Sequence, residues 1–341
     1  MTKLERLKKI DPQLIIMPCG NGNILISNFL QGRIMSEING ELIHRFEADL
    51  AENPDPENFN NLGGNSLWPA PEGGDFAFNY PPQGDWYVQE GINKTQSSIV
   101  EQGENFTVIG KEFELLNRKG NRMKVTWRRR VECAAAGNYG VDALQYCTSE
   151  SMTLAEPVAL EDGVISAWSL EQFPGAAGIT AFGRCAKGAE QGINTDFYGD
   201  PLARMSFKDE WFRFALGGPN RLQIGISSAA APELIGSFDP SRGIAVIRTT
   251  PARNDGRYIN FADNDQKNGV FSAADQFSIF NGSEELNFFE LETLAPMTLD
   301  PQGRVIGSTL DSETLILRGE NSKVIKILTE KFQVPAEFLN C

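Results

Sequence analysis

Residues 105–133, NFTVIGKEFELLNRKGNRMKVTWRRRVEC, carry the clearest signal of the fold in this sequence. Two runs rich in β-branched and aromatic residues flank Lys119-Gly120-Asn121, which has the composition of a turn. From Met123 to Val131 every second residue is apolar except Arg129, so these alternate side chains share one face of a strand. The pattern predicts a β-meander in which Arg129 either lies in a buried or cleft-lining position, where it needs a polar partner, or belongs to a solvated edge.

Further strands are predicted on both sides of this meander. Residues 24–38 and 41–46 are apolar runs joined by Asn39-Gly40, which is the strongest short signal for a hairpin. Strand-like runs recur after residue 142 at roughly ten-residue spacing, with glycine, proline or asparagine between them. Helical periodicity is confined to residues 1–10 and 322–333, the latter with Ser322 as a predicted N-cap. These observations predict an all-β sandwich or barrel that forms a single domain over residues 1–341.

Composition limits the possible partners. The chain carries 45 acidic and 31 basic residues, a net charge of −14, which argues against a broad nucleic-acid surface and against anionic membranes. It has five cysteines and one histidine, His44, with no C-x-x-C pair, so neither a zinc site nor a disulfide framework is expected, and no cofactor. No run of eighteen apolar residues occurs. We therefore expect a soluble, cytoplasmic protein with reduced thiols; its oligomeric state is left open.

Residues 61–86, NLGGNSLWPAPEGGDFAFNYPPQGDW, form the first candidate for a binding site. Gly63-Gly64 permits backbone angles closed to other residues, and prolines such as Pro69 argue against a central strand, so a rigid loop is predicted. The loop carries Trp68, Glu72 and Trp86, and aromatic faces and carboxylates suit the two kinds of surface of a sugar. The alternative is a proline-rich cover whose tryptophans are core residues.

A carboxylate pair is the second candidate. In NFFELETLAP, Glu290 and Glu292 point to the same face of a predicted strand, roughly 6–7 Å apart along it. Like charges at this spacing raise each other's proton affinity, which suits a general base acting on a sugar hydroxyl. In AWSLEQFPG, Gln172 lies near a strand end, where loops build binding sites. The alternatives are a solvent-facing E-x-E strand and an ordinary turn.

Three of these segments together resemble a known family. GGNSLWPAPEGG (63–74), ISAWSLEQFPG (165–175) and FFELETLAPM (288–297) resemble signatures of a bacterial family of unknown function in the galactose-mutarotase-like superfamily. The opening, ILISNFLQGRIMSEINGE (24–41), is similar to the first strands of aldose epimerases. The segments occur in the family's order and together span most of the chain.

The resemblance implies a large antiparallel β-supersandwich with a carbohydrate site on its concave face. It implies that Glu292, or alternatively Glu290, corresponds to the glutamate that takes the anomeric hydroxyl proton in aldose epimerases. The histidine that protonates the ring oxygen has no counterpart around Trp168 to Gln172, and His44 lies in a different segment.

Three functions are therefore compared. The leading hypothesis is a carbohydrate-binding protein, with catalysis left open, whose site contains Trp68, Glu72, Trp86, Arg129, Gln172 and Glu292. The second is an enzyme, either an aldose or hexose-phosphate epimerase or a carbohydrate hydrolase or lyase, with Glu292 and Glu290 as catalytic residues. The third is a structural or interaction protein; an aromatic-lined cleft would favour a ligand, whereas a filled face would favour a scaffold.

Overall fold

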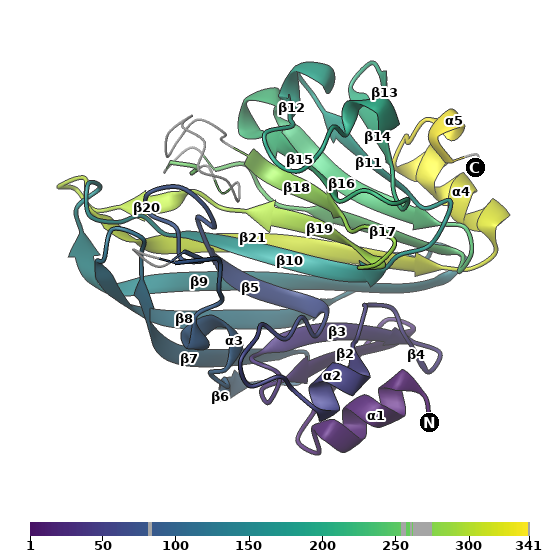
Figure 1. The fold of residues 1–341 in the computed structure, drawn as a ribbon. Helices are drawn as coiled ribbons and strands as arrows, with labels where there is room; N and C mark the ends of the chain where they lie inside the picture. The colour runs from purple at the N-terminus through teal and green to yellow at the C-terminus, as the bar shows by residue number, and fades with distance from the viewer. Residues whose placement is uncertain (81–83, 254–256, 260, 262–274, 340–341) are drawn as a thin grey trace.

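A computed structural model describes residues 1–80, 84–253, 257–259, 261 and 275–339. Residues 81–83 of the stretch 61–86 therefore lie outside the described residues. Two large antiparallel sheets face each other, and short helices lie at their margins (Figure 1). The predicted all-β class is confirmed, and the fold is a β-supersandwich.

The first sheet has ten strands and carries the N-terminal strands at one edge. Its spatial order is β1 (Ile15–Cys19), β2 (Gly22–Ser27), β3 (Arg33–Ile38), β5 (Gly64–Ala70), β10 (Ser166–Pro174), β19 (Phe288–Leu294), β18 (Asp275–Asn281), β15 (Leu222–Ser227) and β12 (Ile193–Asn194), and β4 (Glu41–Leu42) pairs with β3. Asn39 and Gly40 both have positive φ in the β3–β4 turn, where Ile38 pairs with Glu41, so the predicted hairpin is confirmed.

The second sheet has eleven strands and contains the meander predicted from residues 105–133. Its order is β13 (Met205–Lys208), β14 (Trp211–Ala215), β11 (Thr180–Cys185), β16 (Pro232–Asp239), β17 (Ile244–Thr249), β21 (Val305–Arg318), β9 (Asp142–Val158), β8 (Arg122–Ala134), β7 (Phe106–Leu116) and β6 (Ser98–Gln102), and β20 (Met297–Leu299) pairs with β21. Along β8 burial alternates as predicted, so that Trp127 and Arg129 lie inside while Arg128 is exposed.

The helices cover parts of the outer faces. The longer ones are α1 (Lys3–Ile10) and α4 (Asn321–Lys331), and the shorter ones are α2 (Ala48–Glu52), α3 (Glu90–Asn93) and α5 (Ala336–Leu339), with 3₁₀ turns at Glu190–Gly192, Leu202–Arg204 and Ser228–Ala230. α1 begins with a capping box between Thr2 and Glu5. α4 is present as predicted, but its N-cap is Glu320 rather than Ser322 and has no side-chain capping bond.

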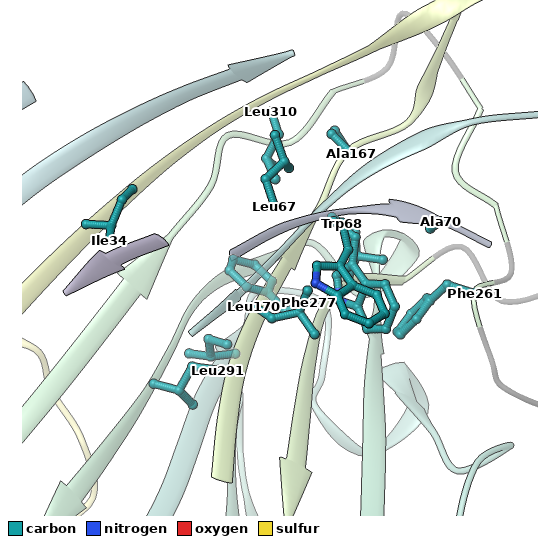
Figure 2. Close-up of a cluster of buried hydrophobic side chains, with 14 of the residues drawn as sticks. Ile34, Leu67, Trp68, Ala70, Ala167, Leu170, Phe261, Phe277, Leu291 and Leu310 are labelled. Carbon is teal, nitrogen blue, oxygen red and sulfur yellow. The ribbon is translucent and has the colours of Figure 1, made fainter. Parts of the chain in front are cut away.

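The main core fills the space between the two sheets. Figure 2 shows part of it, including Leu67 of β5, Leu291 of β19 and Leu310 of β21. Smaller apolar clusters seat α1 and α2 on β2 and β3, and α4 and α5 on the second sheet. Helices α1 and α2 thus cover the outer face of the first sheet near β2 and β3, but they do not cover its middle strands β5, β10 and β19.

Two further predictions from sequence are wrong. Residues 64–70, which include Pro69, form β5 in the middle of the first sheet rather than part of a loop. The proline is tolerated because β3 pairs with β5 only at Asn65, so from Ser66 onward β5 has a paired strand on one side only. Cys19 of β1 and Cys133 of β8 form a disulfide, whereas reduced thiols were expected; the partners are 114 residues apart and no spacing signals the pair.

Candidate functional site

Three neighbouring strands build the candidate site. In β5, β10 and β19 alternate residues point away from the second sheet, and the register places Trp68 opposite Trp168 and Gln172 opposite Glu290. Gly63 and Gly64 both have positive φ, and a side chain at Gly63 would collide with the backbone oxygen of Arg45. The glycine pair therefore lets the start of β5 approach Arg45 closely.

A cavity of about 330 Å³ lies over this face of the sheet. That volume falls in the range of roughly 300–1,000 Å³ seen for small-molecule sites. Six of the seven residues selected from sequence line it, namely Trp68, Glu72, Trp86, Gln172, Glu290 and Glu292. Residues far apart in sequence are therefore brought together by strand pairing.

The wall of the cavity is aromatic. The rings of Trp68 and Trp168 meet edge to face with centroids 6.3 Å apart, and Phe59 contacts Trp68 and Trp86 in the same way at 5.5 Å and 6.0 Å. The indole N–H of Trp86 donates to Oε1 of Glu72 over 3.1 Å. Trp68 and Trp168 are buried, whereas Trp86 is 38% exposed and stands at the rim.

The first carboxyl group, Glu290, is held by an oriented amide. Arg45 Nη1 donates to Oε1 of Gln172 over 2.9 Å, so the Nε2 atom of the same amide faces Glu290 and donates to its Oε1 over 2.7 Å. Burial raises the pKa of Glu290, while the bond from Gln172 and the positive charge of Arg45 act in the opposite direction.

The second carboxyl group, Glu292, is fully buried. The indole N–H of Trp168 donates to its Oε2 over 3.0 Å, and its Oε1 has no hydrogen-bond partner within the described residues. Burial and the negative charge of Glu290 raise the pKa of Glu292 well above its usual value. The floor of the cavity thus holds two carboxyl groups with different surroundings.

Two cationic residues of the cavity were missed from sequence. Arg33 of β3 and Arg221, just before β15, both line it. Arg33 donates to the backbone oxygen of Gly63 over 2.6 Å, and burial lowers its pKa to about 10. The guanidinium of Arg221 lies 3.7 Å from the ring centroid of Tyr198, another cavity residue. Arg33 belongs to a strand predicted from sequence, but only the order of strands in the sheet places it beside β5.

Arg129 is the predicted site residue that does not line the cavity. It is fully buried between the sheets, where its Nε donates to Oε1 of Glu150 over 2.6 Å and its Nη1 donates to the backbone oxygens of Gly32 and Asn65. Glu150 is the polar partner that the sequence predicted for Arg129. Both side chains lie between the two sheets, whereas the cavity lies on the opposite face of the first sheet. We therefore remove Arg129 from the candidate site.

A second buried charge network lies directly behind the site. Glu171 of β10 points into the sandwich, where Tyr146 and Thr314 donate to it and the Nε atom of Arg248 lies 3.6 Å from its Oε2. Burial would raise the pKa of Glu171, but the positive charge of Arg248 together with His44 and Tyr146 outweighs burial, and the pKa falls well below its usual value. Arg248 also donates to the backbone and side-chain oxygens of Ser169. The odd-numbered residues of β10 thus anchor the strand while the even-numbered ones face the cavity.

The described part of the chain contains no group of three or more His, Cys, Asp or Glu side chains arranged to hold a metal ion. Among its helices, none combines the length and the apolar character that a membrane crossing requires.

Solved structures with a similar fold include two of about the same length. A putative aldose 1-epimerase from Escherichia coli K12 aligns with a TM-score of 0.52 and 14% identity, covering 89% of this chain and 98% of that chain. The Slr1438 protein from Synechocystis sp. PCC 6803 aligns with a TM-score of 0.54 and 11% identity, covering 89% and 94%. At such identities the similarity establishes a galactose-mutarotase-like fold and nothing finer.

Sequence comparison gives the family. No curated protein matches the chain. The model of one family, described as a family of unknown function (DUF6786), matches residues 1–339. The chain therefore belongs to this family of unknown function, which here has the fold of the galactose-mutarotase-like, aldose-epimerase-like proteins.

Proposed function

We propose that the protein binds a small carbohydrate in the cavity over β5, β10 and β19. The observation that carries the proposal is the combination of an aromatic wall with two carboxyl groups on the floor. Aromatic faces take the C–H side of a sugar ring, and carboxyl groups take its hydroxyls. The similarity of the fold to a putative aldose 1-epimerase supports the same class of ligand.

A panel of reducing sugars and sugar phosphates tests the proposal. Calorimetric titration would measure the affinity of wild type and of two variants, Trp86→Ala, which removes an exposed ring from the rim, and Glu290→Gln, which removes a carboxylate from the floor. We expect saturable binding of at least one sugar and a loss of about tenfold in Trp86→Ala, corresponding to ~1.4 kcal/mol.

The matched control is Glu112→Gln. Glu112 and Glu114 form another E-x-E pair, exposed on β7 of the second sheet, so this substitution removes a carboxylate of the same spacing away from the cavity. Sugar affinities that do not change in Trp86→Ala and Glu290→Gln would show that the site is elsewhere, and a panel without any binding would contradict the proposal.

An aldose epimerase or mutarotase is the second candidate function. Glu290 and Glu292 extend from the same face of one strand, so both reach the same side of a bound ligand. Glycoside hydrolases instead place their two carboxyl groups on either side of the scissile bond. The arrangement therefore favours ring opening of a free sugar over hydrolysis of a glycosidic bond.

A further inference from the structure

The acid of a ring-opening reaction in this cavity has to be something other than histidine. The chain has a single histidine, His44, which is buried and does not line the cavity. Its Nδ1 accepts from the backbone N–H of Ser36 over 3.0 Å, its ring stacks on Phe173, and its Nε2 lies 3.8 Å from Glu171. These partners fix the imidazole on the interior side of β10, out of reach of a ligand in the cavity.

We propose, building on the proposed sugar site, that Glu292 donates the proton to the ring oxygen of a bound aldose and that Glu290 accepts the proton of its anomeric hydroxyl. This assignment gives Glu292 the role opposite to the one that the family resemblance implies. It goes beyond binding, because it makes the two carboxyl groups a complete acid–base pair.

Burial raises the pKa of Glu290, but its polar and charged neighbours favour the ionised form more than those of Glu292 do. It accepts the amide N–H of Gln172, and the guanidinium groups of Arg45 and Arg221 act on it from the loop after β4 and from the start of β15. Arg33 of β3 lines the same cavity and interacts electrostatically with Glu290. A carboxylate among three guanidinium groups is suited to receive a proton rather than to hold one beforehand.

The surroundings of Glu292 favour its protonated form. It is fully buried, it receives the indole N–H of Trp168, and it lies beside Glu290 on the same strand, close enough for a hydrogen bond between the two carboxyl groups that raises the pKa of Glu292. The hydroxyl of Ser278 acts on its pKa in the opposite direction. No other described residue satisfies the Oε1 of Glu292, so a proton held by the pair can pass from Glu292 to the oxygen of a ligand that enters the cavity. Burial and the negative charge of Glu290 raise the pKa of Glu292 well above the ordinary value of a glutamate. Glu72 and Tyr198 are the other titratable residues that line the cavity.

The proposed reaction balances without a co-reactant. Glu290 removes the proton from the anomeric oxygen, the bond between the anomeric carbon and the ring oxygen breaks, and Glu292 protonates the ring oxygen, which leaves the open-chain aldehyde. The aldehyde group then rotates about its bond to the neighbouring carbon. The hydroxyl formed from the ring oxygen attacks the other face of the aldehyde and returns its proton to Glu292, while Glu290 returns the other proton to the anomeric oxygen. The two reacting oxygens share one carbon, so two carboxyl groups on one face of a strand can serve both. The pair holds one proton before and after each cycle.

The experiment follows anomeric exchange of the bound sugar by saturation-transfer NMR between pH 4 and pH 9. The variants are Glu290→Gln and Glu292→Gln, with Glu112→Gln as the control. We expect wild-type exchange faster than buffer with a bell-shaped pH profile, a loss of about 10²–10⁴ in each cavity variant, and no change in the control. Because both variants slow the reaction, carboxyl ¹³C titration of labelled glutamate assigns the roles: Glu292 should keep its proton to a higher pH than Glu290.

Each other outcome has a definite meaning. If Glu290 keeps its proton to the higher pH, the roles are reversed and the proposal is overturned. Sugar binding without faster exchange also overturns it, while the binding function stands. If no sugar binds, both this assignment and the proposed function fail, and calorimetry separates that case from the previous one.

Discussion

Removal of the buried guanidinium of Arg129 should destabilise the protein without lowering its affinity for the proposed sugar ligand. Glu150 on β9 is fully buried, its Oε1 accepts from Arg129, and its Oε2 has no hydrogen-bond partner within the described residues. Arg129→Met therefore leaves the buried carboxylate of Glu150 without its guanidinium partner. Breaking a buried pair in this way costs about 3–5 kcal/mol of unfolding free energy.

The cost can be divided between charge and hydrogen bonding. In the double variant Arg129→Met/Glu150→Gln the uncompensated charge disappears, so part of the lost unfolding free energy should be recovered. The backbone oxygens of Gly32 and Asn65 still lose the N–H groups that Arg129 supplies. We expect the double variant to stay below wild type by about 1–3 kcal/mol, the usual cost of buried polar groups without partners.

Thermal and urea unfolding measure these differences. For 341 residues the entropy of unfolding is about 0.7 kcal/mol/K, so the single variant should lower Tm by about 4–7 °C. Arg128→Met, one residue away on the exposed face of β8, is the matched control and should change stability by less than about 0.5 kcal/mol. A single variant as stable as wild type would refute the account of the buried pair. A loss of sugar affinity in folded Arg129→Met would instead restore Arg129 to the site.

Two further predictions concern stability. Reduction of the Cys19–Cys133 disulfide, or its replacement by Cys19→Ala/Cys133→Ala, should cost about 2–4 kcal/mol, because the link closes a loop with a sequence separation of 114; equal unfolding midpoints with and without reductant would contradict this. Glu292→Gln should be more stable than wild type at pH 7, because the raised pKa of Glu292 means that its contribution to stability is present at low pH and is lost as pH rises. Urea unfolding should show this advantage shrinking toward pH 4, and an advantage independent of pH would contradict the assigned cause.

The strands could be predicted from sequence because their signals are local. Alternation along residues 105–133 and the Asn39-Gly40 turn depend only on neighbouring residues, and both predictions are confirmed. The prediction for Pro69 was wrong because a proline in a strand loses a hydrogen bond only where a second strand pairs with it, and β3 pairs with β5 only at Asn65. That information belongs to the order of strands in the sheet, which periodicity does not contain.

The candidate site could be predicted in part for the same reason. Its aromatic and acidic residues stand out by type, and six of the seven selected residues line one cavity. Arg33 and Arg221 have no such local signal, and Arg129 was assigned to a ligand although the alternation along β8 already placed it beside Trp127. Alternation gives the face of a strand, but it does not tell which face meets the other sheet and which meets a ligand.

The two faces of β10 are under different constraints in evolution, because one contacts the cavity and the other contacts the interior of the sandwich. Trp168, Leu170 and Gln172 face the cavity, whereas Ser169 and Glu171 are bound into the charge network behind it. Even-numbered positions can therefore change to suit a new ligand while the odd-numbered ones continue to hold the strand in register. Relatives that accept different ligands should therefore differ mainly at every second residue of β10. The positions between them should be retained whatever the ligand, because they hold the strand in place.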